Sequence, residues 1–197
     1  MSTLFDTLSQ RLERGLAGPA PDLWPDPRIE AIAHFKPAAV LIAFTERAEP
    51  GVLMLHRPSS MRAHPGQIAF PGGRIDPGEN AIEAALREAD EELGIDPASV
   101  RVVGEGDKYR TGSGYEVTPV LGVIPPDIEI VPNPAEVARW FEAPAHFVFD
   151  TANHVARTLE WEGRPREYVE ITWQGHRIWG VTGAIISNLT RRMNWHD

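Results

Sequence analysis

A cluster of carboxylates in one short segment is the feature of this sequence best suited to chemistry. Placed on a helix at 100° per residue, Glu88, Glu91 and Glu92 fall within an arc of about 100°. Carboxylates this close repel one another by about 1 to 4 kcal/mol per pair at about 4 Å, depending on the effective dielectric. A divalent cation would turn that repulsion into coordination. Mg²⁺ suits such a cluster because it prefers oxygen ligands and keeps several waters, so the segment predicts a metal site for diphosphate chemistry.

An acidic, solvated helix face is the alternative interpretation of the same cluster. Arg87 and other basic neighbours could then pair with the glutamates along the helix surface. The carboxylates taken alone leave both interpretations open.

The segment that carries the cluster has the pattern of a capped amphipathic helix over Ala81 to Leu93. Asn80 and Glu83 fit a capping box at its start, and Gly94 fits its stop. Apolar residues gather on a different arc from the acids, so one face would pack while the other presents carboxylates. These apolar residues are Ile82, Leu86, Ala89 and Leu93.

The segment also resembles the Nudix hydrolase motif G-x5-E-x7-R-E-U-x-E-E-x-G-U, in which U is aliphatic. Ala89 stands where a larger aliphatic residue is usual, a departure that bears on packing more than on chemistry. The resemblance implies an α/β (α+β) Nudix fold, in which a mixed β-sheet is sandwiched between α-helices. It also implies hydrolysis of a nucleoside diphosphate linked to another group. The matching residues are Gly73, Glu79, Arg87, Glu88, Glu91, Glu92, Gly94 and Ile95.

Carried over by position, the motif implies a site for Mg²⁺ or Mn²⁺. Glu88 and Glu92 would be the principal ligands, and Glu91 would contribute directly or through water. Gly73 would let its backbone approach the metal.

The motif also implies supporting and proton-transferring groups. Glu79 and Arg87 would hold the loop and orient the carboxylates. Because the general base varies within this superfamily, Glu88, Glu91 and the downstream Glu136 all remain candidates.

The segment before the motif is similar to the signature of the coenzyme A pyrophosphatase branch of this superfamily. Arg57, Arg62, Gly66 and the run Phe70 to Gly73 meet its spacing. The resemblance implies hydrolysis of coenzyme A and acyl-CoA derivatives to adenosine 3′,5′-bisphosphate and (acyl-)4′-phosphopantetheine. Weaker similarities lie at Tyr115 to Val120, Asn133 to Val137 and Ile178 to Thr182.

Substrate-binding residues are expected in this upstream segment, although each has a plainer interpretation. Arg57 and Arg62 could bind phosphate in a bidentate manner or form surface salt bridges. His64 could contact phosphate or position water, or it could be a hydrogen-bonded loop residue. Gly72 and Gly73 could admit the diphosphate close to the backbone and also form a tight turn.

Other functions remain as alternatives. The same metal helix could hydrolyse ADP-ribose, a dinucleotide or a capped RNA end. A Nudix-fold module that senses a nucleotide without cleaving it is a further possibility, but such a module would be expected to lose motif carboxylates, and all are present here. Tyr115, Trp140 and Trp179 could stack on adenine or belong to the core, and we assign none of them to the site.

Composition indicates one domain and disfavours nucleic-acid and membrane partners, and the resemblance implies a small-molecule substrate. The 197 residues are 42% hydrophobic, with a net charge of −9 and a pI near 5.3, which disfavours bulk binding to nucleic acid or anionic membranes. The absence of cysteine excludes disulfides and thiolate chemistry. Neither a signal-like start nor an apolar stretch of about 20 residues is present, so we expect a cytoplasmic protein. Nothing here chooses between a monomer and a homodimer.

The remaining elements are predicted from periodicity. Residues 1–30 should form an N-terminal helix, Thr3 to Leu16, and an extended connector, with residues 31–197 forming the Nudix domain. Ala38 to Thr45 and Val52 to His56 should form a hairpin. Further strands are expected at Gln67 to Phe70, Arg101 to Glu105, Val117 to Ile124, Ile128 to Val131, Thr158 to Trp161, Tyr168 to Trp173 and Arg177 to Trp179, and a last helix at Thr182 to Arg192.

Overall fold

The structure is a computed structural model that describes residues 3–19, 24, 26–59, 66–161 and 164–195. Its helices are α1 (Leu4–Ala17), α2 (Ala81–Leu93), α3 (Ala145–Val148) and α4 (Gly180–Met193), with short 3₁₀ turns η1 (Pro27–Ala31), η2 (Pro97–Ser99) and η3 (Thr151–Asn153). Its strands are β1 (Lys36–Thr45), β2 (Gly51–His56), β3 (Ile68–Ala69), β4 (Gly72–Arg74), β5 (Arg101–Glu105), β6 (Tyr109–Arg110), β7 (Tyr115–Ile124), β8 (Arg139–Pro144), β9 (Val155–Trp161), β10 (Arg164–Trp173) and β11 (His176–Trp179).

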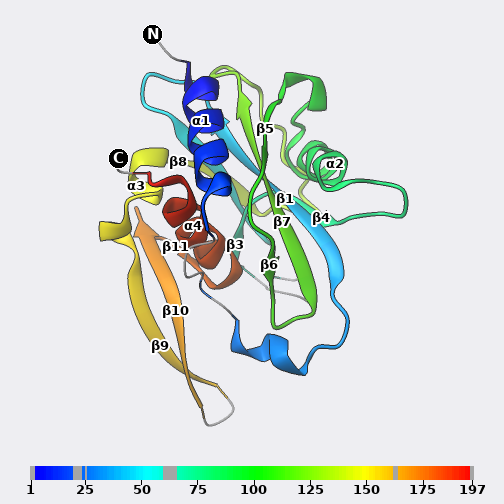
Figure 1. Ribbon diagram of the computed structural model, residues 1–197. Coiled ribbons are helices and arrows are strands. Elements are labelled where there is room, and N and C mark those ends of the chain that lie inside the picture. The colour runs from blue at the N-terminus through cyan, green and yellow to red at the C-terminus, as the bar shows by residue number, and fades with distance from the viewer. Residues whose placement is uncertain (1–2, 20–23, 25, 60–65, 162–163, 196–197) are drawn as a thin grey trace.

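A mixed sheet forms the centre of the molecule. Strands β1 and β7 run parallel over their full lengths, and β5 and β2 flank them. Along its other edge, β1 pairs first with β4 and then with β2, both antiparallel. A smaller antiparallel sheet has the order β11-β10-β9 and extends away from the main sheet (Figure 1).

Helices cover both faces of the main sheet, because β1 is apolar on both of its sides. Ile42 and Phe44 belong to one core, whereas Leu41 and Ala43 belong to the other. Helix α2 packs on the second core, and α1 and α4 pack on the first, as Figure 1 shows from the side. The expected sandwich of a mixed sheet between helices is therefore confirmed.

Most predicted elements are confirmed, including the hairpin of β1 and β2 and the three long helices α1, α2 and α4. Helix α1 begins after the N-cap Thr3, whose hydroxyl accepts from the Asp6 backbone N–H in a capping box. Parts of the connector, residues 20–23 and 25, lie outside the described residues. None of the described helices is long and apolar enough to cross a bilayer.

The strand predicted at Ile128 to Val131 is wrong. The backbone N–H of Val131 donates to the Leu93 carbonyl, and that of Asn133 donates to the Glu92 carbonyl. The segment therefore bonds to the last turn of α2 in place of a neighbouring strand, and its apolar residues cover the core beneath that helix. A strand that was not predicted, β8, pairs with β2.

A buried arginine ties the N-terminal helix to the C-terminal one. The side chain of Arg192 is 5% exposed and bonds to both carboxylate oxygens of Asp107. It also donates to the carbonyl oxygens of Gly15, Gly18 and Pro19, just where α1 ends. This one guanidinium therefore joins α1, α4 and the segment before β6.

We expect Arg192→Met to lower the free energy of unfolding by about 3 kcal/mol, because it leaves a half-buried carboxylate and three carbonyls without their donor. Urea denaturation followed by circular dichroism measures this. Arg101→Met is the matched control: Arg101 pairs with Glu46 at the surface, where the loss should stay below about 1 kcal/mol. Equal losses in the two variants would contradict the anchoring role.

A pair of histidines between β2 and β11 makes stability depend on pH. His56 Nε2 lies 2.9 Å from His176 Nδ1, and burial, with Arg139 nearby, lowers the pKa of His56 from 6.5 to about 4. Burial also lowers the pKa of His176. The unfolded chain therefore takes up protons first, so this contribution to stability is present above pH 6.5 and is lost as the pH falls toward 4.

Denaturation at about pH 7.5 and about pH 5 measures this dependence. His56→Gln should lose less of its free energy of unfolding across that interval than the unmodified chain does. The same loss in both proteins would show that other groups carry the dependence.

Candidate metal and diphosphate site

Helix α2 is held in one rotation about its axis by its caps and its buried face. The Asn80 side chain accepts from the Glu83 backbone N–H, and Gly94 ends the helix in the left-handed conformation, with φ of 67°. Small residues pack against the sheet, which brings the helix close to it. These are Ala84, Ala85 and Ala89. With this face buried, Glu88 and Glu92 lie beside β4, so the helix supplies acids at the edge of the sheet.

Two glycines allow that close approach. The backbone N–H of Gly72 donates to Glu92 Oε2 at 2.9 Å. A Cβ on Gly73 would stand 2.3 Å from Glu88 Oε1, and one on Gly72 would stand 2.4 Å from the Ala39 carbonyl oxygen. A side chain at Gly72 would strike the backbone of β1, and one at Gly73 would displace the Glu88 carboxylate. The tight turn expected at these glycines is wrong, because both belong to β4 and pair with β1, but their backbone does lie close to the acids.

Arg87 links the carboxylates to the loop before the helix. Its Nε donates to Glu79 at 2.7 Å, and its Nη1 donates to Glu88 at 3.0 Å and Glu91 at 3.1 Å. Its Nη2 reaches the Arg74 carbonyl at 3.0 Å. These bonds raise the pKa of Arg87 and lower that of Glu79. The arginine therefore fixes the loop and orients Glu88 without lining the cavity described next.

A cavity of about 560 Å³ opens beside these groups. Glu88, Glu92 and Glu136 line it together with the backbone of Gly72 and Gly73. Its volume suits a cofactor-sized ligand. Further walls come from Arg57, Gln67 to Phe70, Arg74, Thr111, Ser113 and Tyr115, and from Val181, Thr182 and Ile185 on α4.

Arg57 brings positive charge to this cavity from the end of β2. Its Nε is buried and has no hydrogen-bond partner among the described residues. Its charge is close enough to favour the ionised form of Glu92. A buried guanidinium with an unused donor suits a phosphate oxygen.

Burial makes the carboxylates unusually basic. Glu92 is 3% exposed, and desolvation raises its pKa to about 8 despite the bond from Gly72. Desolvation also raises the pKa of Glu88. A divalent cation would offset this desolvation and the mutual repulsion of the acids, so the donor set fits Mg²⁺ or Mn²⁺.

Among the described residues, no three acidic or histidine side chains already lie close enough together to hold a metal ion. Arg87 already bonds to Glu88 and Glu91. Because Mg²⁺ completes its octahedral coordination with water and substrate oxygens, the protein needs to supply only two carboxylates and a backbone carbonyl.

The predicted site residues separate into three groups. Glu88, Glu92, Glu136, Arg57, Gly72 and Gly73 meet at the cavity. Glu91 is 52% exposed and contacts Arg87 outside the cavity lining. Arg62 and His64 lie outside the described residues, so their roles stay predictions.

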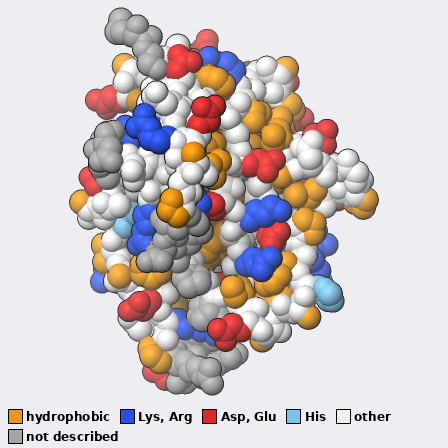
Figure 2. Space-filling model, in the orientation of Figure 1, with side chains coloured by type: hydrophobic (Ala, Val, Ile, Leu, Met, Phe, Trp, Pro, Cys, Tyr) orange, Lys and Arg blue, Asp and Glu red, His pale blue; other side chains and the backbone are white. Residues whose placement is uncertain are grey.

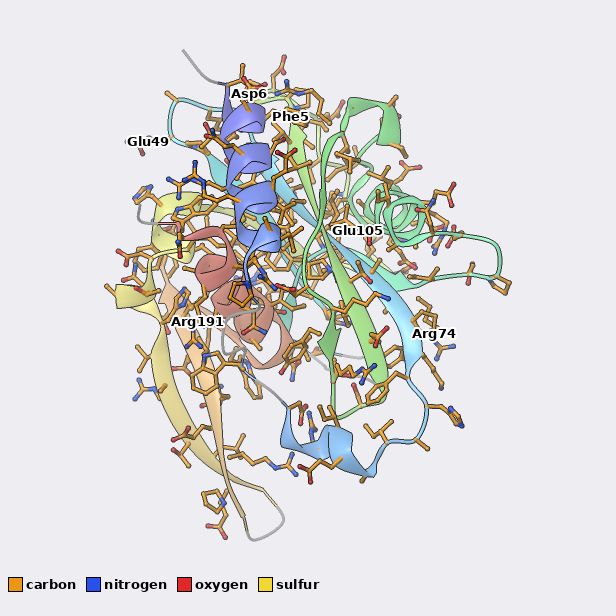
Figure 3. The ribbon with its side chains drawn as sticks, in the orientation of Figure 1. Phe5, Asp6, Glu49, Arg74, Glu105 and Arg191 are labelled. Atoms are coloured by element: carbon orange, nitrogen blue, oxygen red, sulfur yellow. The ribbon has the colours of Figure 1, made fainter. Side chains whose placement is uncertain are left out.

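Some lining residues had no functional signal in the sequence. Thr111 and Ser113 come from the glycine-rich loop before β7, whereas Tyr115 begins β7 and was one of the aromatic residues considered for stacking on adenine. Arg74 lies against the Tyr115 ring, and Figure 3 shows it at the edge of the main sheet. On α4, Val181 and Thr182 fall in the similarity noted at Ile178 to Thr182, whereas Ile185 matched only the core pattern and is brought to the cavity by the packing of α4 over the sheet.

Two basic residues near that loop are engaged elsewhere. Lys108 and Arg110 both pair with Glu116 on β7, at 3.3 Å and 2.8 Å. On the face drawn in Figure 2, basic and acidic side chains lie interspersed in the same way. Neither residue lines the cavity.

Comparison with known proteins identifies the family. A family model described as NUDIX domain matches residues 34–161, more than half of the chain. A protein from Enterobacter sp. (strain 638) is 40% identical over 160 residues, which cover 80% of this chain and 83% of the relative. A protein from Photorhabdus laumondii subsp. laumondii is 37% identical over 157 residues, which cover 79% of this chain and 84% of that relative. Both are named "Uncharacterized Nudix hydrolase NudL". The solved structure of a C. elegans Ap4A hydrolase binary complex has a TM-score of 0.48 and 21% identity, over 55% of this chain and 80% of that one. By its family model and its relatives, the chain belongs to the Nudix hydrolases, enzymes that act on phosphorus-containing anhydrides of nucleotide derivatives.

Proposed function

We propose that this enzyme hydrolyses the diphosphate of coenzyme A and its acyl derivatives, with Mg²⁺ or Mn²⁺ as cofactor. The observation that carries the proposal is the meeting of Arg57, Glu88 and Glu92 at one cavity beside Gly72 and Gly73 of β4. The products would be adenosine 3′,5′-bisphosphate and (acyl-)4′-phosphopantetheine. The upstream segment that ends in Phe70 to Gly73 supports coenzyme A over other nucleoside diphosphates, because its spacing is similar to that branch.

Each group in the cavity has a distinct proposed task. Glu88 and Glu92 hold the cation, and the backbone of Gly73, which passes close to Glu88, contributes its carbonyl in this proposal. The bound ion supplies charge neutralisation on the diphosphate and lowers the pKa of a water. The Arg57 guanidinium binds a phosphate oxygen with the Nε donor that has no partner among the described residues. Arg87 is a positioning residue, because it acts through Glu88.

Glu88 and Glu136 are better placed than Glu91 to take the proton from water. Both line the cavity, whereas Glu91 is half exposed and bonds to Arg87 outside it. The only described side-chain partner of Glu136 is Asn133, whose Nδ2 donates to it at 3.3 Å. A carboxylate that lines the site and is engaged by one neutral donor can act as a base.

A substrate panel tests the proposal directly. Purified protein with Mg²⁺ or Mn²⁺ should release adenosine 3′,5′-bisphosphate from coenzyme A faster than it cleaves ADP-ribose, a dinucleotide or a capped RNA end. Chromatography of the products measures each rate, and a chelator should abolish them. If the protein cleaves ADP-ribose and leaves coenzyme A intact, the proposed substrate is wrong but the enzyme class stands. Nucleotide-induced thermal stabilisation without any product would favour a sensing module.

We expect Glu92→Gln to lower kcat/KM by at least about 100-fold, because it removes a ligand charge and keeps the shape. Its free energy of unfolding should not fall, since a buried amide needs less hydration than a buried carboxylate. Asp90→Asn on the exposed side of the same helix is the matched control and should retain activity. Steady-state kinetics with a Mn²⁺ titration measures both. Full turnover in Glu92→Gln would remove this residue from the ligand set.

A further inference from the structure

A second cavity of about 270 Å³ lies next to the catalytic one. It is bounded by α4, by β10 and β11, and by Trp24, Asp26 and Arg28 of the N-terminal connector. Gln67 and Val181 line both cavities. The two cavities therefore adjoin at these shared side chains.

Aromatic rings form much of the wall of this second cavity. Tyr168 on β10 and Trp179 at the end of β11 lie 5.7 Å apart between ring centroids, at an angle of 62°. Arg177 packs over Trp179 at 4.7 Å from its centroid. The other two rings belong to Trp24 in the connector and to Tyr109 on β6. Four rings from four segments provide flat surfaces for a planar group.

Trp24 adds a polar feature to the wall. Its indole N–H is buried and has no acceptor among the described residues, although an N–H of this kind usually finds one when buried. Arg191 on α4, labelled in Figure 3, packs over the same indole at 5.8 Å. The backbone N–H of Trp24 donates to the Asn188 side chain at 2.8 Å, which fixes the residue against α4.

Asp26 connects the second cavity to the loop of the first. It is 8% exposed, forms an ion pair with Arg28, and accepts from the backbone N–H of Gly112 at 2.7 Å. Gly112 belongs to the same loop as Thr111 and Ser113, which line the catalytic cavity. The connector therefore braces both cavities at once.

We propose that the second cavity binds the nucleobase of the substrate while the first binds its diphosphate. A nucleobase is flat and carries hydrogen-bond acceptors on its edge, which suits a wall of rings in which the buried Trp24 indole N–H has no acceptor among the described residues. An alkyl chain would leave that N–H unsatisfied. This subsite deepens the function proposed above and rests on it for the identity of the base as adenine.

Binding of the separate product halves tests the subsite without requiring turnover. Adenosine 3′,5′-bisphosphate should quench the intrinsic tryptophan fluorescence, since Trp24 and Trp179 line the cavity. Trp179→Leu and Tyr168→Leu should each raise its Kd about tenfold, because stacking on one ring is lost. The Kd for 4′-phosphopantetheine should stay unchanged. Trp140→Leu is the matched control, because Trp140 is an exposed residue of β8 that lines neither cavity.

The outcomes separate this inference from the proposed function. If both variants weaken 4′-phosphopantetheine and leave the bisphosphate unchanged, the cavity holds the pantetheine arm and the inference is wrong. If a folded variant, checked by circular dichroism, binds both halves as the unmodified chain does, the cavity is no subsite. A failure of the proposed function appears instead in the unmodified enzyme, as coenzyme A that is not cleaved. In that case quenching by AMP, relieved by the same two variants, would still support a nucleobase subsite.

Discussion

The close contact between β4 and α2 is the constraint on which the site depends. Gly72 donates its backbone N–H to Glu92, and Gly73 leaves no room for any atom between itself and Glu88. A side chain at Gly73 would displace the Glu88 carboxylate, and one at Gly72 would strike the backbone of β1. The alanines on the buried face of α2 allow the same short distance, because larger residues would hold the helix further away.

That proximity creates an electrostatic imbalance which the surrounding groups correct only in part. Desolvation raises the pKa of Glu92 to about 8 and raises that of Glu88 as well. Arg87 neutralises the outer side of the cluster, toward Glu79 and Glu91, but it does not line the cavity. The inner side keeps excess negative charge beside Arg57. Such an environment is costly for folding and favourable for a divalent cation, a common conflict between stability and activity.

The parts of the chain outside the motif bring distant segments to this contact. Arg192 ties α4 to the end of α1, and Asp26 ties the connector to the loop at Gly112. Both are buried charges that bond to backbone groups far away in sequence. Helix α4 and the loop before β7 in turn supply walls of the catalytic cavity. The N-terminal segment thus contributes to the geometry of a site whose acids lie on α2.

The sequence predicted local features well and long-range features poorly. Helix α2, its capping box and its left-handed stop depend on neighbours within a few residues, and they agree with the pattern. The segment Ile128 to Val131 has the composition of a strand, but the Val131 N–H bonds to Leu93 at the end of α2, a residue about 40 positions earlier in the chain. Strand β8 likewise exists because β2 offers it a partner.

The sequence by itself determined the acids, their spacing on one helix face and the glycines that precede them, because the helical repeat and the lack of a side chain are local properties. Only the tertiary structure decided which acids meet the cavity. It separated Glu91 from Glu88 and Glu92, and it brought Glu136 and Arg57 to them. It also placed Trp24, Tyr168 and Trp179 around one space. These outcomes follow from the packing of the connector, α4 and the small sheet on the main sheet. The sequence pattern does not predict such contacts, because the residues that make them are far apart in the chain and share no periodicity.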